Sequence, residues 1–160
     1  MKKLFLIISI AISMVSNAQV TKVSLQASGL TCSMCSNSIH KALKTLDFVD
    51  KVDADIKTYT FEISLKTNSK VDFNLIKKKV EGAGFTVSGF KATVLFNNVQ
   101  LENGRPINIE DMTFYFVNTA DQPLNGIKEV RVIDKGFVSP KEYKRNAVPD
   151  SAPHTYHATL

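Results

Sequence analysis

The spacing of apolar residues between positions 23 and 87 limits the possible folds more than any other feature of this chain. Apolar and polar residues alternate in some segments, as in half-buried strands, and apolar residues recur at helical spacing in others. The alternating segments are 23–27, 52–56, 59–65 and a fourth that begins at 85, and the helical segments are 39–46 and 73–80. The resulting order of strand, helix, strand, strand, helix, strand predicts an α+β fold of the ferredoxin-like βαββαβ type.

The second half of the chain, residues 93–160, carries a different pattern. Short apolar segments alternate with turn signals, which predicts a small all-β unit or a partly open barrel. The expected strands are 94–96, 99–101, 113–117, 130–133 and 156–160. Asn103-Gly104 and Asn125-Gly126 predict turns, and the prolines between 140 and 153 predict a loop before the last strand. We therefore expect two units, at 19–92 and 93–160, with no assigned role for the second.

Residues 1–18 resemble a bacterial signal peptide. Lys2 and Lys3 precede an apolar run from 4 to 15, and small residues end at Ala18, which predicts cleavage before Gln19. The run is shorter than the ~20 residues that a membrane-spanning helix needs, so we expect no stable membrane insertion after cleavage. The expected location is the periplasm or the exterior.

The charge of the chain argues against nucleic acid as a partner. The formal net charge of +5 falls to +3 when Lys2 and Lys3 are removed with the signal peptide. The surplus lies in residues 20–90, which hold 10 lysines and 7 acidic residues. A surplus of this size is typical of a solvated face and is too small for phosphate-backbone binding.

The two cysteines, Cys32 and Cys35, stand where the first predicted strand leads into the first predicted helix. Exported proteins usually pair their cysteines in structural disulfides, but a bond across two residues would constrain the unfolded chain very little. A metal clip or a redox couple is the better interpretation. Unpaired backbone N–H groups and the helix dipole at this position lower the pKa of a thiol, which favours metal capture near neutral pH.

These residues carry a family resemblance. The run Gly29-Leu30-Thr31-Cys32-Ser33-Met34-Cys35, its place between strand and helix, and Gly84-Phe85 after the second helix resemble a heavy-metal-associated domain over residues 21 to about 92. This family includes copper chaperones, the amino ends of copper- and zinc-transporting ATPases and the periplasmic mercury-binding protein. Leu30 stands where the family usually has Met, and we expect it to lie in the core.

The resemblance implies that Cys32 and Cys35 are the metal ligands and that Phe85 packs beneath the metal loop. Soft thiolates favour Cu(I), with Hg(II), Zn(II) and Cd(II) as alternatives. Two thiolates satisfy an ion that accepts two-coordination, whereas structural zinc usually takes four protein ligands. The expected role is a non-enzymatic metallochaperone or scavenger. Expected partners are a metal-transporting membrane protein or another CxxC metal acceptor.

Two other classes of function compete with metal binding. A periplasmic thiol-disulfide oxidoreductase would use the same CxxC pair, although the chain has no Trp beside it and no Pro between residues 20 and 105. An adhesion or interaction protein with an incidental disulfide is the third class. Further ligands are not expected: His40 and Met34 are interpreted as surface residues, and His154 and His157 would point to opposite faces of a strand.

Overall fold

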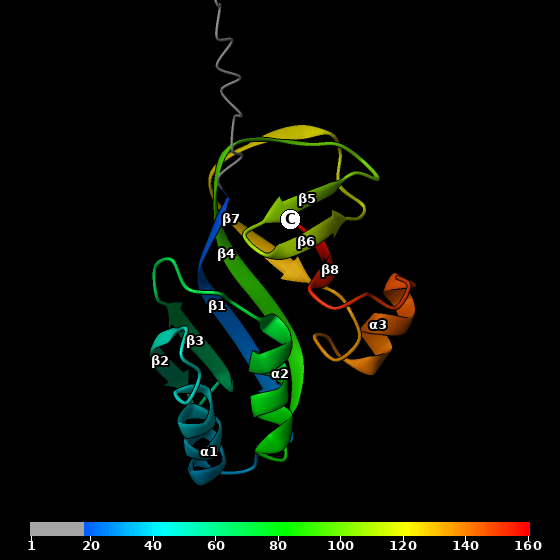
Figure 1. Cartoon of the computed structure of the whole chain (residues 1–160). Helices are drawn as coiled ribbons and strands as arrows, with labels where there is room; N and C mark the ends of the chain where they lie inside the picture. Colours follow the sequence, from blue (N-terminus) through cyan, green and yellow to red (C-terminus); the bar gives the residue numbers. More distant parts are fainter. Residues whose placement is uncertain (1–17) are drawn as a thin grey trace, which may run out of the picture.

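The computed structural model describes residues 18–160, so the predicted signal segment lies outside the described residues except for Ala18 (Figure 1). The elements in chain order are β1 (Gln19–Ser28), α1 (Ser33–Leu43), β2 (Val49–Asp55), β3 (Thr60–Leu65), α2 (Phe73–Gly82), β4 (Thr86–Leu101), β5 (Pro106–Ile109), β6 (Met112–Phe116), β7 (Gln122–Val132), α3 (Pro140–Asn146) and β8 (Thr155–Thr159). Within residues 18–160, no helix has the length and apolar character to cross a membrane.

The first half has the predicted ferredoxin-like arrangement. Strands β2, β3, β1 and β4 lie side by side in that order and pair antiparallel, and α1 and α2 pack on one face of this sheet (Figure 1). The helices bury their apolar side chains against it, including Ile39 and Leu43 from α1 and Phe73, Ile76 and Val80 from α2. The α+β fold class is therefore confirmed.

The start of α2 follows from one capping residue. The Asp72 carboxylate accepts hydrogen bonds from the backbone N–H groups of Asn74 at 2.8 Å and Leu75 at 3.4 Å. These donors have no partner inside the helix, so the cap fixes the first turn. Gly84, with φ of +90°, follows the helix and redirects the chain toward β4.

Strand β4 joins the two halves of the chain. It pairs with β1 from Thr86 to Leu95 and with β7 from Lys91 to Leu101. The two short strands predicted at 94–96 and 99–101 are parts of this one strand, which has an irregularity where Asn98 adopts a φ of +50°. The boundary expected between residues 92 and 93 falls inside β4, and the assignment of two units stays a prediction.

The second half is mostly strand, as predicted, and extends the same sheet in the order β4, β7, β8, β6 and β5. Strand β8 runs parallel to β6 and touches the end of β7 through two residue pairs. One short helix, α3, lies where a loop was predicted. The Ser139 side chain caps α3, and Pro140 occupies its first turn. Serine followed by proline is a signal for the start of a helix, but among several prolines it was interpreted as part of a loop.

The turn predicted at Asn125-Gly126 is wrong. Both residues lie inside β7, where Gly126 adopts a φ of +73° opposite Phe96, beside the irregularity in β4. A bulge and a tight turn both need a residue with positive φ, so the dipeptide alone does not distinguish them. The Asn103-Gly104 turn is present between β4 and β5. Strand β5 was not predicted.

Candidate metal site

The loop between β1 and α1 is shaped by Gly29 and Leu30. Gly29 has a φ of +91°, and a Cβ atom added there would lie 3.9 Å from Cδ1 of Phe85. The Phe85 ring, which is partly buried against the core, therefore lies close to the loop at Gly29. Leu30 is buried, as predicted from its apolar character. The buried Leu30 side chain therefore anchors the loop just before the cysteines.

The two cysteines lie together at the start of α1. Cys32 occupies the N-cap position and is exposed, whereas Cys35 is in the first turn and is half-buried against the core. Their Sγ atoms are 2.9 Å apart, and the backbone N–H of Cys35 donates to the carbonyl of Cys32 at 3.1 Å. One thiolate can therefore be stabilised by the thiol beside it.

The pKa of the Cys35 thiol is lowered from its ordinary value of 9.0 to about 7. The largest cause is the hydrogen bond with the Cys32 side chain, followed by one with the Thr31 backbone, and partial burial opposes both. A thiolate at the amino end of a helix also gains from the dipole and the unpaired N–H groups. The pair therefore offers a thiolate, which is a soft ligand, near neutral pH.

The other potential soft or nitrogen donors lie elsewhere. His40 Nε2 is 3.1 Å from the carbonyl oxygen of Val52, so the ring is held against β2. Met34 lies between the cysteines but is 79% exposed. Within residues 18–160, no group of three or more His, Cys, Asp or Glu side chains is arranged to hold a metal ion.

The two carboxyl-terminal histidines lie in different surroundings. His154 is exposed just before β8, whereas His157 is buried within it. The Nδ1 atom of His157 lies 2.8 Å from Asp134 Oδ1 and 3.1 Å from Ser151 Oγ, and its backbone N–H donates to Asp134 Oδ2 at 2.6 Å. Sequence spacing gave no signal for this cluster, because its members come from three segments.

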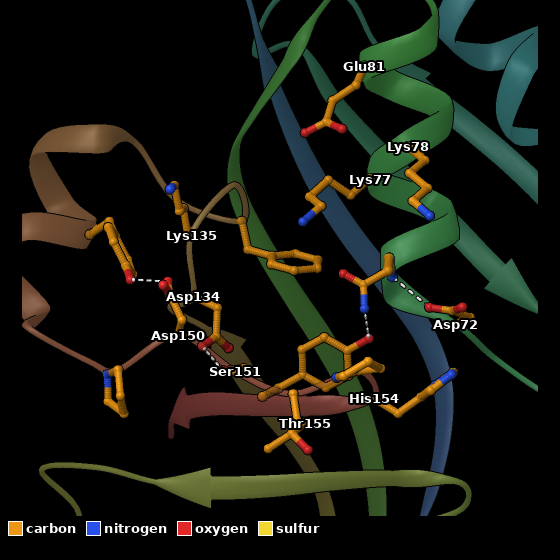
Figure 2. A pocket seen from close by; sticks show the side chains of 17 residues that line it. Asp72, Lys77, Lys78, Glu81, Asp134, Lys135, Asp150, Ser151, His154 and Thr155 are labelled. Carbon is orange, nitrogen blue, oxygen red and sulfur yellow. Dashed lines mark hydrogen bonds between the residues drawn. The ribbon is translucent and has the colours of Figure 1, made fainter.

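Serine, histidine and aspartate also form catalytic triads, but this cluster has a different geometry. In a triad, the serine and the carboxylate contact opposite nitrogens of the imidazole. Here Ser151 and Asp134 both approach Nδ1, and Ser151 Oγ donates to Asp134 Oδ1 at 2.6 Å. The cluster supplies hydrogen-bond donors to the buried Asp134 carboxylate and connects Ser151 to β8 (Figure 2).

A ferredoxin-like domain with paired thiols at the first loop defines the class of a soft-metal-binding domain. Residues 24–86 match the family model of the heavy-metal-associated domain, so this part of the chain is a heavy-metal-associated domain. The match confirms the predicted resemblance and includes both cysteines. Residues 87–160 lie outside it.

The chain is also similar to individual proteins. A probable copper-exporting P-type ATPase from Archaeoglobus fulgidus is 31% identical over 83 residues, which are 52% of this chain and 10% of that protein. The chain therefore spans about a tenth of the length of this relative.

Two solved structures are similar to less than half of this chain but over most of their own length. The yeast copper transporter domain CCC2A, studied in apo and Cu(I)-loaded states, is 32% identical over 41% of this chain and 88% of its own, with a TM-score of 0.38. Oxidised MerP from Ralstonia metallidurans CH34 is 28% identical over 44% of this chain and 94% of its own, with a TM-score of 0.39.

Proposed function

We propose that the protein is an exported metallochaperone or scavenger that holds Cu(I) between Cys32 and Cys35. The observation that carries the proposal is the pair of adjacent thiols at the start of α1, with the pKa of Cys35 lowered to about 7. When a metal ion binds near neutral pH, such a pair can give up its thiol protons to the solvent. The protein binds and passes on an ion, and catalysis is not part of this role.

The choice of Cu(I) rests on the donor set. Two thiolates are soft ligands and suit an ion that accepts two-coordination, whereas structural zinc usually takes four protein ligands. The named function of the archaeal relative, copper export, supports the same ion. Hg(II), Zn(II) and Cd(II) are the alternatives that a titration has to compare.

Metal capture requires the thiol pair to open. The sulfur atoms are 2.9 Å apart. A metal held at about 2.3 Å from each sulfur would separate them by up to about 4.6 Å. Cys32 is exposed at the N-cap, so its side chain can rotate without disturbing the core. Cys35 packs against the core and provides the fixed side of the clip.

Location and partner complete the proposal. The basic start, apolar run and small residues of positions 1–18 support export to the periplasm or beyond. An exported carrier of Cu(I) needs an acceptor with matching soft ligands. We propose a metal-transporting membrane protein or another protein with a CxxC pair, which would exchange the ion thiolate by thiolate.

The rival function is a thiol-disulfide oxidoreductase, and the same adjacent thiols are the observation that favours it. In that chemistry, an accessible thiolate attacks a substrate disulfide. Cys32, the exposed member of the pair, would be that thiol. The match of residues 24–86 to the heavy-metal-associated domain favours the metal clip.

Single substitutions separate the two functions. A clip needs both thiolates, so Cys32→Ser and Cys35→Ser should each remove most of the Cu(I) affinity in competition with a chelator. Ser33→Ala, between the two cysteines, is the matched control and should bind as the parent does. Proteins trapped as mixed disulfides by Cys35→Ser, together with unchanged Cu(I) affinity in both cysteine variants, would establish the oxidoreductase instead.

A further inference from the structure

Two asparagines in the chain are followed by glycine, Asn103 and Asn125. Such a pair is chemically labile, because the backbone nitrogen of the glycine can attack the side-chain amide carbon of the asparagine. A Cβ atom on the following residue would hinder this approach, and glycine has none. Regular strands suppress the reaction, since the side chain stands perpendicular to the sheet while the N–H groups lie within it. Asn103 lies in a turn and Asn125 inside β7, so the reactivity of Asn125 depends on its local geometry.

The side chain of Asn125 is folded back onto the backbone of the next residue. Its Oδ1 accepts a hydrogen bond from the backbone N–H of Gly126 at 3.1 Å. Gly126 has a φ of +73°, and a Cβ atom added there would meet nothing within 4 Å outside the adjacent residues. The side-chain amide of Asn125 therefore lies against the nitrogen that would attack it, with open space around both groups.

Asn125 also lies at a break in the pairing of β7 with β4. The register is regular down to Gly126 and resumes at Leu124, and Asn125 between them has no partner residue in β4. On the other side of β7, β8 pairs only with Arg131 and Val132. Within residues 18–160, no strand therefore pairs with Asn125 on either side. Its side chain is exposed, so water reaches the amide.

We propose that Asn125 is a site of spontaneous deamidation and isoaspartate formation. The backbone nitrogen of Gly126 gives its proton to a base in the solvent and forms a bond to Cγ of Asn125. The bond between Cγ and the side-chain nitrogen breaks, and this nitrogen takes up a proton and leaves as ammonia, so that a succinimide ring closes. Water then opens the ring at either carbonyl carbon. The products are aspartate and isoaspartate, with one water consumed and one ammonia released.

The two products differ in what they do to β7. Isoaspartate inserts an extra main-chain atom between residues 124 and 126, and both of these residues pair with β4. Leu124 is fully buried, so a shift of this segment moves it out of its core position. Aspartate keeps the chain length and only adds a negative charge at an exposed position. The isoaspartate form should therefore unfold at a lower temperature than the parent, whereas the aspartate form should not.

Ageing of the full chain in mildly alkaline buffer, followed by peptide mapping and labelling with an isoaspartate-specific methyltransferase, tests the proposal. Products at Asn125 should form at least about tenfold faster than at Asn97. Asn97 is the matched internal control, because it is exposed in the adjacent strand and precedes Asn98, which has a positive φ of +50° but carries a Cβ atom. Asn125→Gln should abolish the product, since the longer side chain cannot close the same ring. Peptide mapping separates these products from those of Asn103.

Equal rates at Asn125 and Asn97 would overturn the assignment of the site. The effect on β7 is tested by thermal unfolding of the aged protein beside freshly purified Asn125→Asp, which carries the charge without the extra atom. An isoaspartate-containing protein that unfolds at the same temperature as Asn125→Asp would overturn that effect. The test is independent of the proposed metal function, because Asn125 lies outside residues 24–86. A variant with both Cys32→Ser and Cys35→Ser should form the products at the parent's rate.

Discussion

Asn74 on α2 donates a hydrogen bond from its side-chain amide to the hydroxyl of Tyr156 on β8, 3.1 Å away and 82 residues later in the chain. Beside it, the Phe73 ring packs on Phe90, Phe114 and Tyr156, with ring centres 4.8 to 6.1 Å apart. The second helix of the heavy-metal-associated domain therefore shares its core with the second half of the chain.

This shared core predicts that the two halves unfold together. Phe73→Ala should lower the free energy of unfolding by about 3–5 kcal/mol, because it removes a buried ring that contacts both halves. Chemical denaturation followed by circular dichroism would measure the loss in a single transition. Tyr156→Phe is the milder comparison and should cost about 1 kcal/mol, since it removes only the hydrogen bond. Two separate transitions in the parent would contradict the prediction.

Gly29 is predicted to be required for the shape of the metal loop. Its φ of +91° is strained for any residue with a side chain, so Gly29→Ala should cost about 1–2 kcal/mol in thermal unfolding. Gly82→Ala is the matched control. Gly82 lies at the end of α2 with open space around it, so alanine there should be neutral or stabilise by up to about 1 kcal/mol. Equal effects at both positions would show that the φ at Gly29 is not constraining.

The lowered pKa of Cys35 sets the pH dependence of metal binding. The thiolate binds the ion, so protons compete as the pH falls through about 7. As the pH falls below about 7, the apparent Cu(I) affinity should decrease by a further factor of about ten per pH unit, because the Cys35 proton then also has to be displaced. Competition with a Cu(I) chelator across this range measures the profile. A flat profile on both sides of neutrality would show that these thiols are not the ligands.

Oxidation of Cys32 and Cys35 to a disulfide should abolish Cu(I) binding. The Sγ atoms of Cys32 and Cys35 are 2.9 Å apart and Cys32 is exposed, so we expect a disulfide to form readily in air. Mass spectrometry would detect the loss of two hydrogens, and Cu(I) uptake should disappear with it and return after reduction. Cys35→Ser, which cannot form this bond, is the control for the mass measurement and should not lose two hydrogens. Full Cu(I) uptake by the oxidised protein would exclude the cysteine pair as the ligand set.

The local spacing of apolar residues was enough to predict the fold of the heavy-metal-associated domain. The periods of Val23 to Ala27 and of Phe73 to Val80 reflect which faces of a strand and a helix are buried, and this is a property of neighbouring residues. The place of Cys32 and Cys35 at a strand-to-helix junction follows from the same pattern. Burial of Leu30 agrees with expectation, and the Phe85 ring lies near Gly29 in the loop before the cysteines.

Tertiary structure decided the features that join distant segments. Asp134 and His157 form a buried cluster with the partly buried Ser151, and the ammonium group of Lys77 lies over the Phe137 ring, although no local period links these residues. The role of Gly126 could not be predicted locally either. Its positive φ is compatible with a turn or with a bulge, and only the partner strand distinguishes the two. Local propensity records only which backbone conformations a residue tolerates. Tertiary contacts selected one of these conformations at each position, through the pairing of β4 with β7 and the packing of α2 on β8. Local propensity cannot make this choice, because burial and hydrogen bonding depend on partners far away in the chain.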